Sequence, residues 1–126
     1  MSNALKQTTL YLLVLVLLIF SVSCAKEPQK EPIAGPFVKE TGYCWIADLP
    51  KYESSADSAK DGNKSKLVLY EDGKTLGPVH SIHDDIRQKG QGRFSHWGKN
   101  VYFSTSDNSD PNTNGRKYSI AIGDKQ

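Results

Sequence analysis

Three histidines are the residues of this chain whose chemistry first suggests a site. His80, His83 and His96 are the only histidines in the 126 residues. His80 and His83 stand three apart, so on a helix their imidazoles would share one face. Asp84 or Asp107 could then complete a set of ligands for a metal such as zinc. This arrangement would make the protein a small metal-dependent hydrolase or lyase, and it is one alternative for the function.

Other catalytic arrangements find little support. Ser95 and His96 are adjacent in a strand-like run, so their side chains point to opposite faces and cannot easily form a nucleophile and base. Asp84 and Asp85 diverge by about 100° on a helix, and near a helix N-terminus they are explained by the macrodipole. Neither CxxC nor Cys/His zinc spacing occurs in the chain. The sequence therefore favours a binding protein over an enzyme.

A polar loop at residues 106–116 contains the first part of a calcium-binding motif, which starts at Asp110. Asp110, Asn112 and Asn114, followed by glycine, match the start of the D-x-[DN]-x-[DN]-G loop. The match then ends, because Ala121 stands where the motif needs a bidentate Glu. Asn, Asp, Ser and Gly at these spacings also build successive Asx turns. We expect turns here, with calcium as the alternative.

The same region offers a surface for a sugar. Amide and carboxylate groups can hydrogen-bond hydroxyl groups, an indole ring can pack on the face of a sugar, and guanidinium groups can bind an anionic substituent. The candidate ligand-binding residues are Arg93, His96, Trp97, Asp107, Asn108, Asp110, Asn114 and Arg116.

These residues need a sheet to position them. Strands are predicted at 43–48, 65–71, 74–76, 92–97, 101–105 and 117–122, since these runs are rich in apolar and aromatic residues and end at turn residues. Asp72-Gly73 predicts a tight hairpin turn. Helical spacing of Ile82 and Ile86 predicts one short helix over 80–89, and residues 51–64 read as a loop. The fold class is mainly β with one short helix, in a small antiparallel sheet that is either barrel-like or half of a sandwich.

Upstream of this domain the chain is organised for export. A lightly basic start and the apolar run 10–20 predict a signal peptide over 1–23, since the run is too short to span a membrane. Residues 24–36 hold three prolines and alternating charges, which predicts an extended, disordered spacer. The small β domain is then expected at 37–126.

The end of the signal, Ser21-Val22-Ser23-Cys24, resembles the lipobox of bacterial lipoproteins. The resemblance implies that Cys24 is lipidated and becomes the mature N-terminus, which would attach the protein to a membrane in the cell envelope. Ser21 departs from the aliphatic residue of that motif, so a secreted or soluble periplasmic protein is the alternative. In that case Cys24 and Cys44 could form a disulfide in an oxidising compartment.

The balance of basic and acidic residues limits the partners that the protein can bind. Without residues 1–23 the chain has 15 basic and 14 acidic side chains, since the only charged residue removed is one Lys. A nucleic-acid-binding surface needs a basic excess, so we expect no nucleic acid.

The second half of the chain resembles a small β module of bacterial cell-surface polysaccharide proteins, most distinctively in FSHW (94–97), SDNSDP (106–111) and TNGR (113–116). The resemblance implies an envelope-glycan context but no established activity or site residue. We therefore expect an exported module that binds envelope glycan or a related polar ligand. An interaction subunit of an envelope enzyme is a further alternative.

Overall fold

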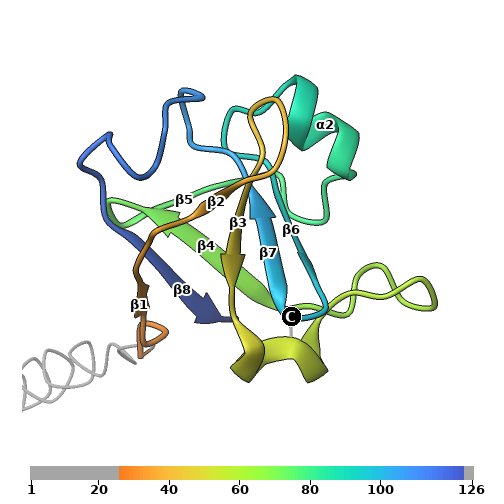
Figure 1. Cartoon of the computed structure of the whole chain (residues 1–126). Coiled ribbons are helices and arrows are strands. Elements are labelled where there is room, and N and C mark those ends of the chain that lie inside the picture. Colours follow the sequence, from red (N-terminus) through yellow and green to blue (C-terminus); the bar gives the residue numbers. More distant parts are fainter. Residues whose placement is uncertain (1–25, 124–126) are drawn as a thin grey trace, which may run out of the picture.

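The computed structural model describes residues 26–123. Its elements follow in the order β1 (Glu31–Ile33), β2 (Val38–Lys39), β3 (Trp45–Asp48), the 3-10 helix η1 (Pro50–Ser55), β4 (Leu67–Glu71), β5 (Lys74–Thr75), α2 (His83–Gln88), β6 (Phe94–Trp97), β7 (Asn100–Phe103) and β8 (Tyr118–Ile122) (Figure 1).

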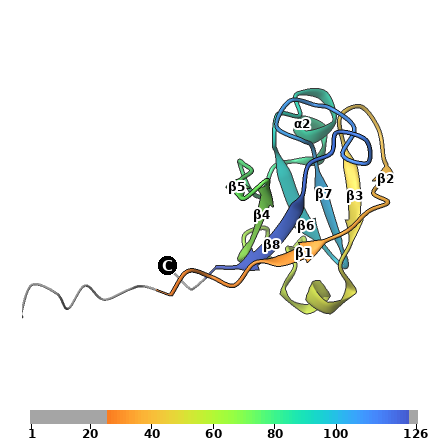
Figure 2. The ribbon, with the colours of Figure 1, turned by 90° about the vertical axis from the view of Figure 1, so that its left-hand side faces the viewer.

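The strands form two antiparallel four-stranded sheets. One has the order β1-β8-β4-β5 and the other β2-β3-β7-β6. Figure 2 shows them as two layers. The predicted mainly β, antiparallel fold is confirmed, although neither sheet closes into a barrel. A second short helix, η1, lies in the segment that was predicted to be a loop.

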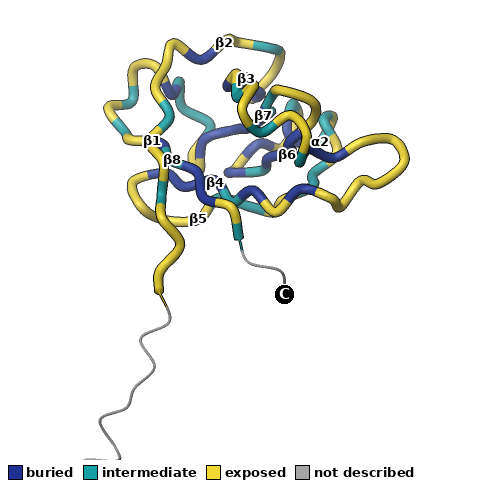
Figure 3. The backbone as a smooth tube through the Cα atoms, turned by 90° about the horizontal axis from the view of Figure 1, so that it is seen from below, coloured by how far each residue is buried: buried dark blue, intermediate teal, exposed yellow. Residues whose placement is uncertain are grey.

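The two sheets share one hydrophobic core. Phe37, Phe103 and Tyr118 contact one another, with ring centroids 5.2–5.6 Å apart. Leu69 and Ile120 are fully buried beside them. In Figure 3 the buried segments gather on the strands, while the loops are largely exposed.

Turn chemistry explains two of the hairpins. Asp72 and Gly73 both have positive φ, as the predicted tight turn between β4 and β5 requires. Gly98, also at positive φ, and Lys99 connect β6 to β7, where Trp97 pairs with Asn100.

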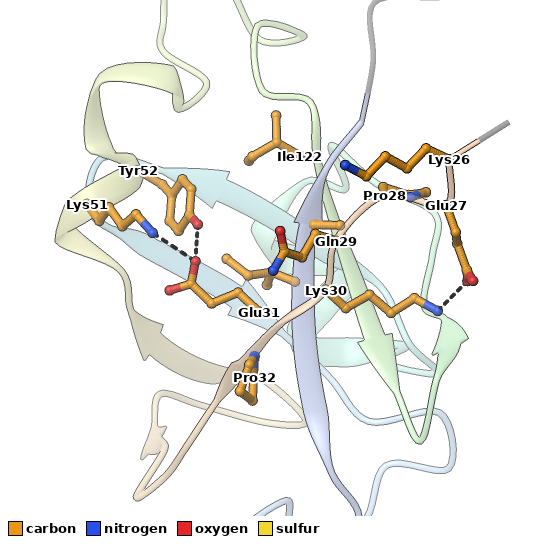
Figure 4. Close-up of a pocket in the computed structure, with 12 residues that line it drawn as sticks. Lys26, Glu27, Pro28, Gln29, Lys30, Glu31, Pro32, Lys51, Tyr52 and Ile122 are labelled. Atoms are coloured by element: carbon orange, nitrogen blue, oxygen red, sulfur yellow. Dashed lines mark hydrogen bonds and ion pairs between the residues drawn. The ribbon is translucent and has the colours of Figure 1, made fainter.

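The spacer predicted at 24–36 contains a strand. Within it, β1 pairs with β8, placing Glu31 opposite Ile120 and Ile33 opposite Tyr118. The Glu31 carboxylate also accepts hydrogen bonds from Lys51 and the Tyr52 hydroxyl on η1 (Figure 4). The folded domain therefore begins before residue 37, contrary to the predicted boundary. The prolines are compatible with this because β1 is an edge strand.

Two predictions concern the N-terminal residues before position 26. The signal at 1–23 and the lipidation residue Cys24 lie outside the described residues. Among residues 26–123, Cys44 is buried and has no disulfide partner, and its alternative partner, Cys24, lies outside them. Among residues 26–123, no helix has the length and apolar character needed to cross a membrane.

Candidate ligand-binding groove

An open groove lies where β6 meets the segment before α2. It has a volume of about 490 Å³ and is lined by Gly62, His80, Ser81, Ile82, His83 and Trp97. Trp97 is 37% exposed and Ile82 is 67% exposed. Large apolar side chains left in solvent beside polar groups are typical of a binding site.

His83 forms one wall of the groove. As the first residue of α2, it lies with its ring centroid 4.2 Å from that of Tyr102 and 6.2 Å from that of Trp97. Burial lowers the pKa of this imidazole, and the nearby Arg87 guanidinium lowers it further. The lowered pKa favours the uncharged form of the ring that packs beside Trp97.

His80 lies on the same groove in a different setting. Its φ is +55°, in the left-handed region that non-glycine residues rarely adopt. Its Nδ1 lies 2.6 Å from Oδ2 of Asp57, whose side chain is fully buried. The other carboxylate oxygen, Oδ1, accepts the backbone N–H of Ser65 at 2.8 Å. The fold thus holds an accessible imidazole against a carboxylate that water does not reach.

His96 is behind the groove rather than in it. It is 1% exposed, and its Nδ1 lies 2.7 Å from the Ser65 hydroxyl. Burial lowers its pKa, and its Nε2 has no hydrogen-bond partner among the residues that the structure describes. The expectation that His96 lies on an exposed surface is therefore wrong. Strand alternation turns this side chain inward, while Trp97, the next residue, points out.

The three histidines do not share a ligand position. His80 is held by Asp57, His96 by Ser65, and His83 stacks on Tyr102. Within residues 26–123 no three His, Cys, Asp or Glu side chains are grouped so that they could hold a metal ion. The helix also begins at His83, so the expected helical face shared by His80 and His83 is not formed.

Arg116 anchors the polar loop 106–116 to the fold. Its guanidinium contacts Oε1 of Glu71 at 2.6 Å and both carboxylate oxygens of Asp107, at 2.8 and 2.6 Å. Hydrogen bonds from Arg116 and Ser109 hold the pKa of Asp107 well below its usual range. Arg116 and Asp107 were both predicted to contact a ligand, but their charges pair with each other and with Glu71.

The loop also contains the predicted Asx turns. Carboxylate or amide oxygens of Asp107, Asp110 and Asn114 each accept the backbone N–H two residues further on. Asn112 hydrogen-bonds both backbone groups of Phe37. Each of the calcium candidates Asp110, Asn112 and Asn114 thus has one side-chain oxygen that accepts a backbone N–H.

Two further predicted ligand residues, Asn108 and Arg93, form hydrogen bonds with backbone groups. Asn108, at φ +65°, accepts the N–H of Gln91 and donates to the carbonyl of Lys89. Arg93 donates to the carbonyl of Gly90 at 2.9 Å.

The eight predicted site residues therefore do not form one site. Trp97 and His96 lie at the β6–β7 turn, whereas the loop 106–116 follows the other end of β7, at the upper left of Figure 1. Trp97 is the only one of the eight that lines the groove.

A larger hollow, of about 680 Å³, lies where residues 26–32 cross β8 beside η1 (Figure 4). Four of its charged groups form two pairs: Lys51 with Glu31, and Lys30 with Glu27. It has no buried polar group directed at a ligand, so we place the candidate site at Trp97.

Sequence reasoning missed Asp57 and Ser65. Both lie in or beside a polar segment without periodicity, where a carboxylate and a hydroxyl normally indicate solvent exposure. No signal in the sequence distinguishes them from their exposed neighbours. Comparison of the chain with protein-family models, curated proteins and solved structures finds no match.

Proposed function

We propose that this protein is an exported, lipid-anchored β module that binds envelope glycan in the groove at Trp97. The observation that carries the proposal is the half-exposed indole beside two polar groups, His80 and Ser81, on one open surface. The proposal moves the binding site away from the loop 106–116, where the sequence placed most of it.

The groove has the two properties that a sugar ring requires. Trp97 and Ile82 offer an apolar surface on which the C–H face of a ring can pack. His80 and Ser81 offer hydrogen bonding at the edge of that surface. The walls are firm, because His80 is held by Asp57 and Trp97 is supported by His83. A site that is already ordered loses less conformational entropy on binding.

Support for the location comes from the sequence alone. A signal-like segment, the lipobox-like residues before Cys24 and the resemblance to cell-surface polysaccharide modules all favour the cell envelope. Lipid on Cys24 would restrict the module to a membrane surface.

A glycan array followed by titration calorimetry tests the proposal. We expect binding of at least one envelope polysaccharide and a loss of about tenfold in affinity for Trp97→Ala, in line with the contribution of one aromatic contact. Tyr43→Ala is the matched control, since Tyr43 is 41% exposed but does not line the groove. Absence of any glycan ligand, or equal effects of the two substitutions, would contradict the proposal.

A further inference from the structure

The geometry around His80 points to the chemical class of the ligand: we infer that the groove selects sugars whose hydroxyl or amino groups donate hydrogen bonds, and rejects uronates and sulfated sugars. This inference rests on the proposed function. It concerns which groups of a sugar the site accepts, and it follows from the position of one proton.

The buried carboxylate fixes that proton. A neutral imidazole carries its proton on one ring nitrogen only. Nδ1 of His80 faces Oδ2 of Asp57 at 2.6 Å, and an ionised carboxylate only accepts hydrogen bonds. In the neutral imidazole, Nδ1 must therefore hold the proton, which leaves Nε2 as a bare acceptor. His80 lines the groove, and Nε2 is the ring nitrogen that Asp57 does not hold.

The second polar group of the groove is also left as an acceptor. The Ser81 hydroxyl donates its single proton to the carbonyl of Pro78 at 2.7 Å. Its remaining lone pairs can only receive a hydrogen bond. A ligand at His80 and Ser81 must then supply the donors, as sugar hydroxyl and amino groups do.

The charges around the groove act in the same direction. None of the described residues that line it is Lys or Arg. The guanidinium of Arg87, which lowers the pKa of His83, is paired with Glu40 and Asp84. Asp57 places a negative charge directly behind His80. An anionic sugar would therefore meet acceptors and a carboxylate, while an aminated sugar would meet complementary groups.

Asp57→Asn should reverse the preference. The amide oxygen can keep the hydrogen bond from the Ser65 N–H, which turns the amide NH₂ toward His80. That NH₂ donates to Nδ1 and moves the imidazole proton to Nε2, so the acceptor in the groove becomes a donor. Asp61→Asn is the control, because it removes the same charge from the loop that carries Gly62, where the Asp61 carboxylate accepts the N–H of Asn63.

The test uses oligomers of glucosamine, N-acetylglucosamine and galacturonic acid of equal length, titrated at pH 8 by calorimetry. We expect the amino and neutral oligomers to bind about tenfold more tightly than the uronate, the ratio that one unsatisfied polar contact produces. In Asp57→Asn the uronate should bind as well as or better than the others, while Asp61→Asn should leave the order unchanged. Nitrogen-15 NMR of the His80 ring should show the proton on Nδ1 and no proton on Nε2.

Three results would overturn the inference. One is a proton on Nε2 of His80 at pH 8, which the NMR spectrum reports even if Asp57→Asn does not fold. Another is equal or tighter binding of the uronate by the unmodified protein. The third is binding of none of the three oligomers. The proposed function fails separately, when no array glycan binds in a manner sensitive to Trp97→Ala.

Discussion

Removing Arg116 should destabilise the protein because it leaves a buried carboxylate without its cation. Glu71 is 5% exposed, and the Arg116 guanidinium lies 2.6 Å from its Oε1. Breaking a fully buried ion pair by deleting one partner costs about 3–5 kcal/mol. Arg116 is partly exposed, and Glu71 keeps the Ser106 N–H and the Tyr118 hydroxyl. We therefore expect Arg116→Ala to lower the free energy of unfolding by about 2–3 kcal/mol.

The pH dependence of this loss has a defined sign. Burial raises the pKa of Glu71, but hydrogen bonds from Arg116 and Ser106 outweigh it and lower the pKa overall. In the unmodified protein Glu71 therefore stabilises the fold above its unfolded pKa, and this contribution is lost as the pH falls through the lower folded pKa. Without Arg116, burial dominates and the pKa rises. Glu71 then destabilises the fold as the pH increases, so the difference between the two proteins should grow from about pH 3 to pH 6.

Urea unfolding at a series of pH values, followed by tryptophan fluorescence, measures both effects. Arg93→Ala is the matched control, because Arg93 makes one hydrogen bond to a carbonyl and no ion pair in the described part of the chain. Its expected cost is below about 1 kcal/mol. Equal losses for the two variants, or a difference that shrinks between pH 3 and pH 6, would refute the role assigned to Arg116.

Three further predictions concern the interior. Ser65→Ala should cost about 1–3 kcal/mol in urea unfolding, because it leaves Nδ1 of the buried His96 without its partner; an unchanged midpoint would contradict that contact. Burial raises the pKa of the Cys44 thiol to about 12, so this thiol should react with a disulfide reagent only in denaturant, and fast reaction in native buffer would show that it is accessible. Phe103→Ala should lower the free energy of unfolding by about 3–5 kcal/mol through loss of core packing, and a loss under 1 kcal/mol would mean that the two sheets do not share this ring.

The elements that sequence reasoning predicted correctly are those specified by local residues. Asp72-Gly73 requires the positive φ values that it adopts, and the runs that became β4, β6, β7 and β8 carry their own apolar and aromatic residues. By contrast, β1 and β2 are short and mostly exposed, so their own residues give no strand pattern. They are strands because β8 and β3 offer free edges to pair with.

The same difference between local and long-range contacts decides which site contacts the sequence predicts. The Asx turns of Asp107, Asp110 and Asn114 involve the backbone N–H two residues away, so the sequence predicts them. The pairing of Asp57 with His80 joins two segments that meet only in the folded protein. Burial turns an ordinary loop aspartate into the group that orients an imidazole, and nothing next to Asp57 in the chain specifies that burial.

The pairing of β1 with β8 shortens the tether that a lipid on Cys24 would provide. With Glu31 held in the sheet, residues 24–30 alone separate the acyl chains from the first strand. Fully extended, they reach at most about 25 Å. A module held on so short a tether would contact only material within about 25 Å plus its own diameter of the membrane. Longer-range capture would require β1 to detach from β8.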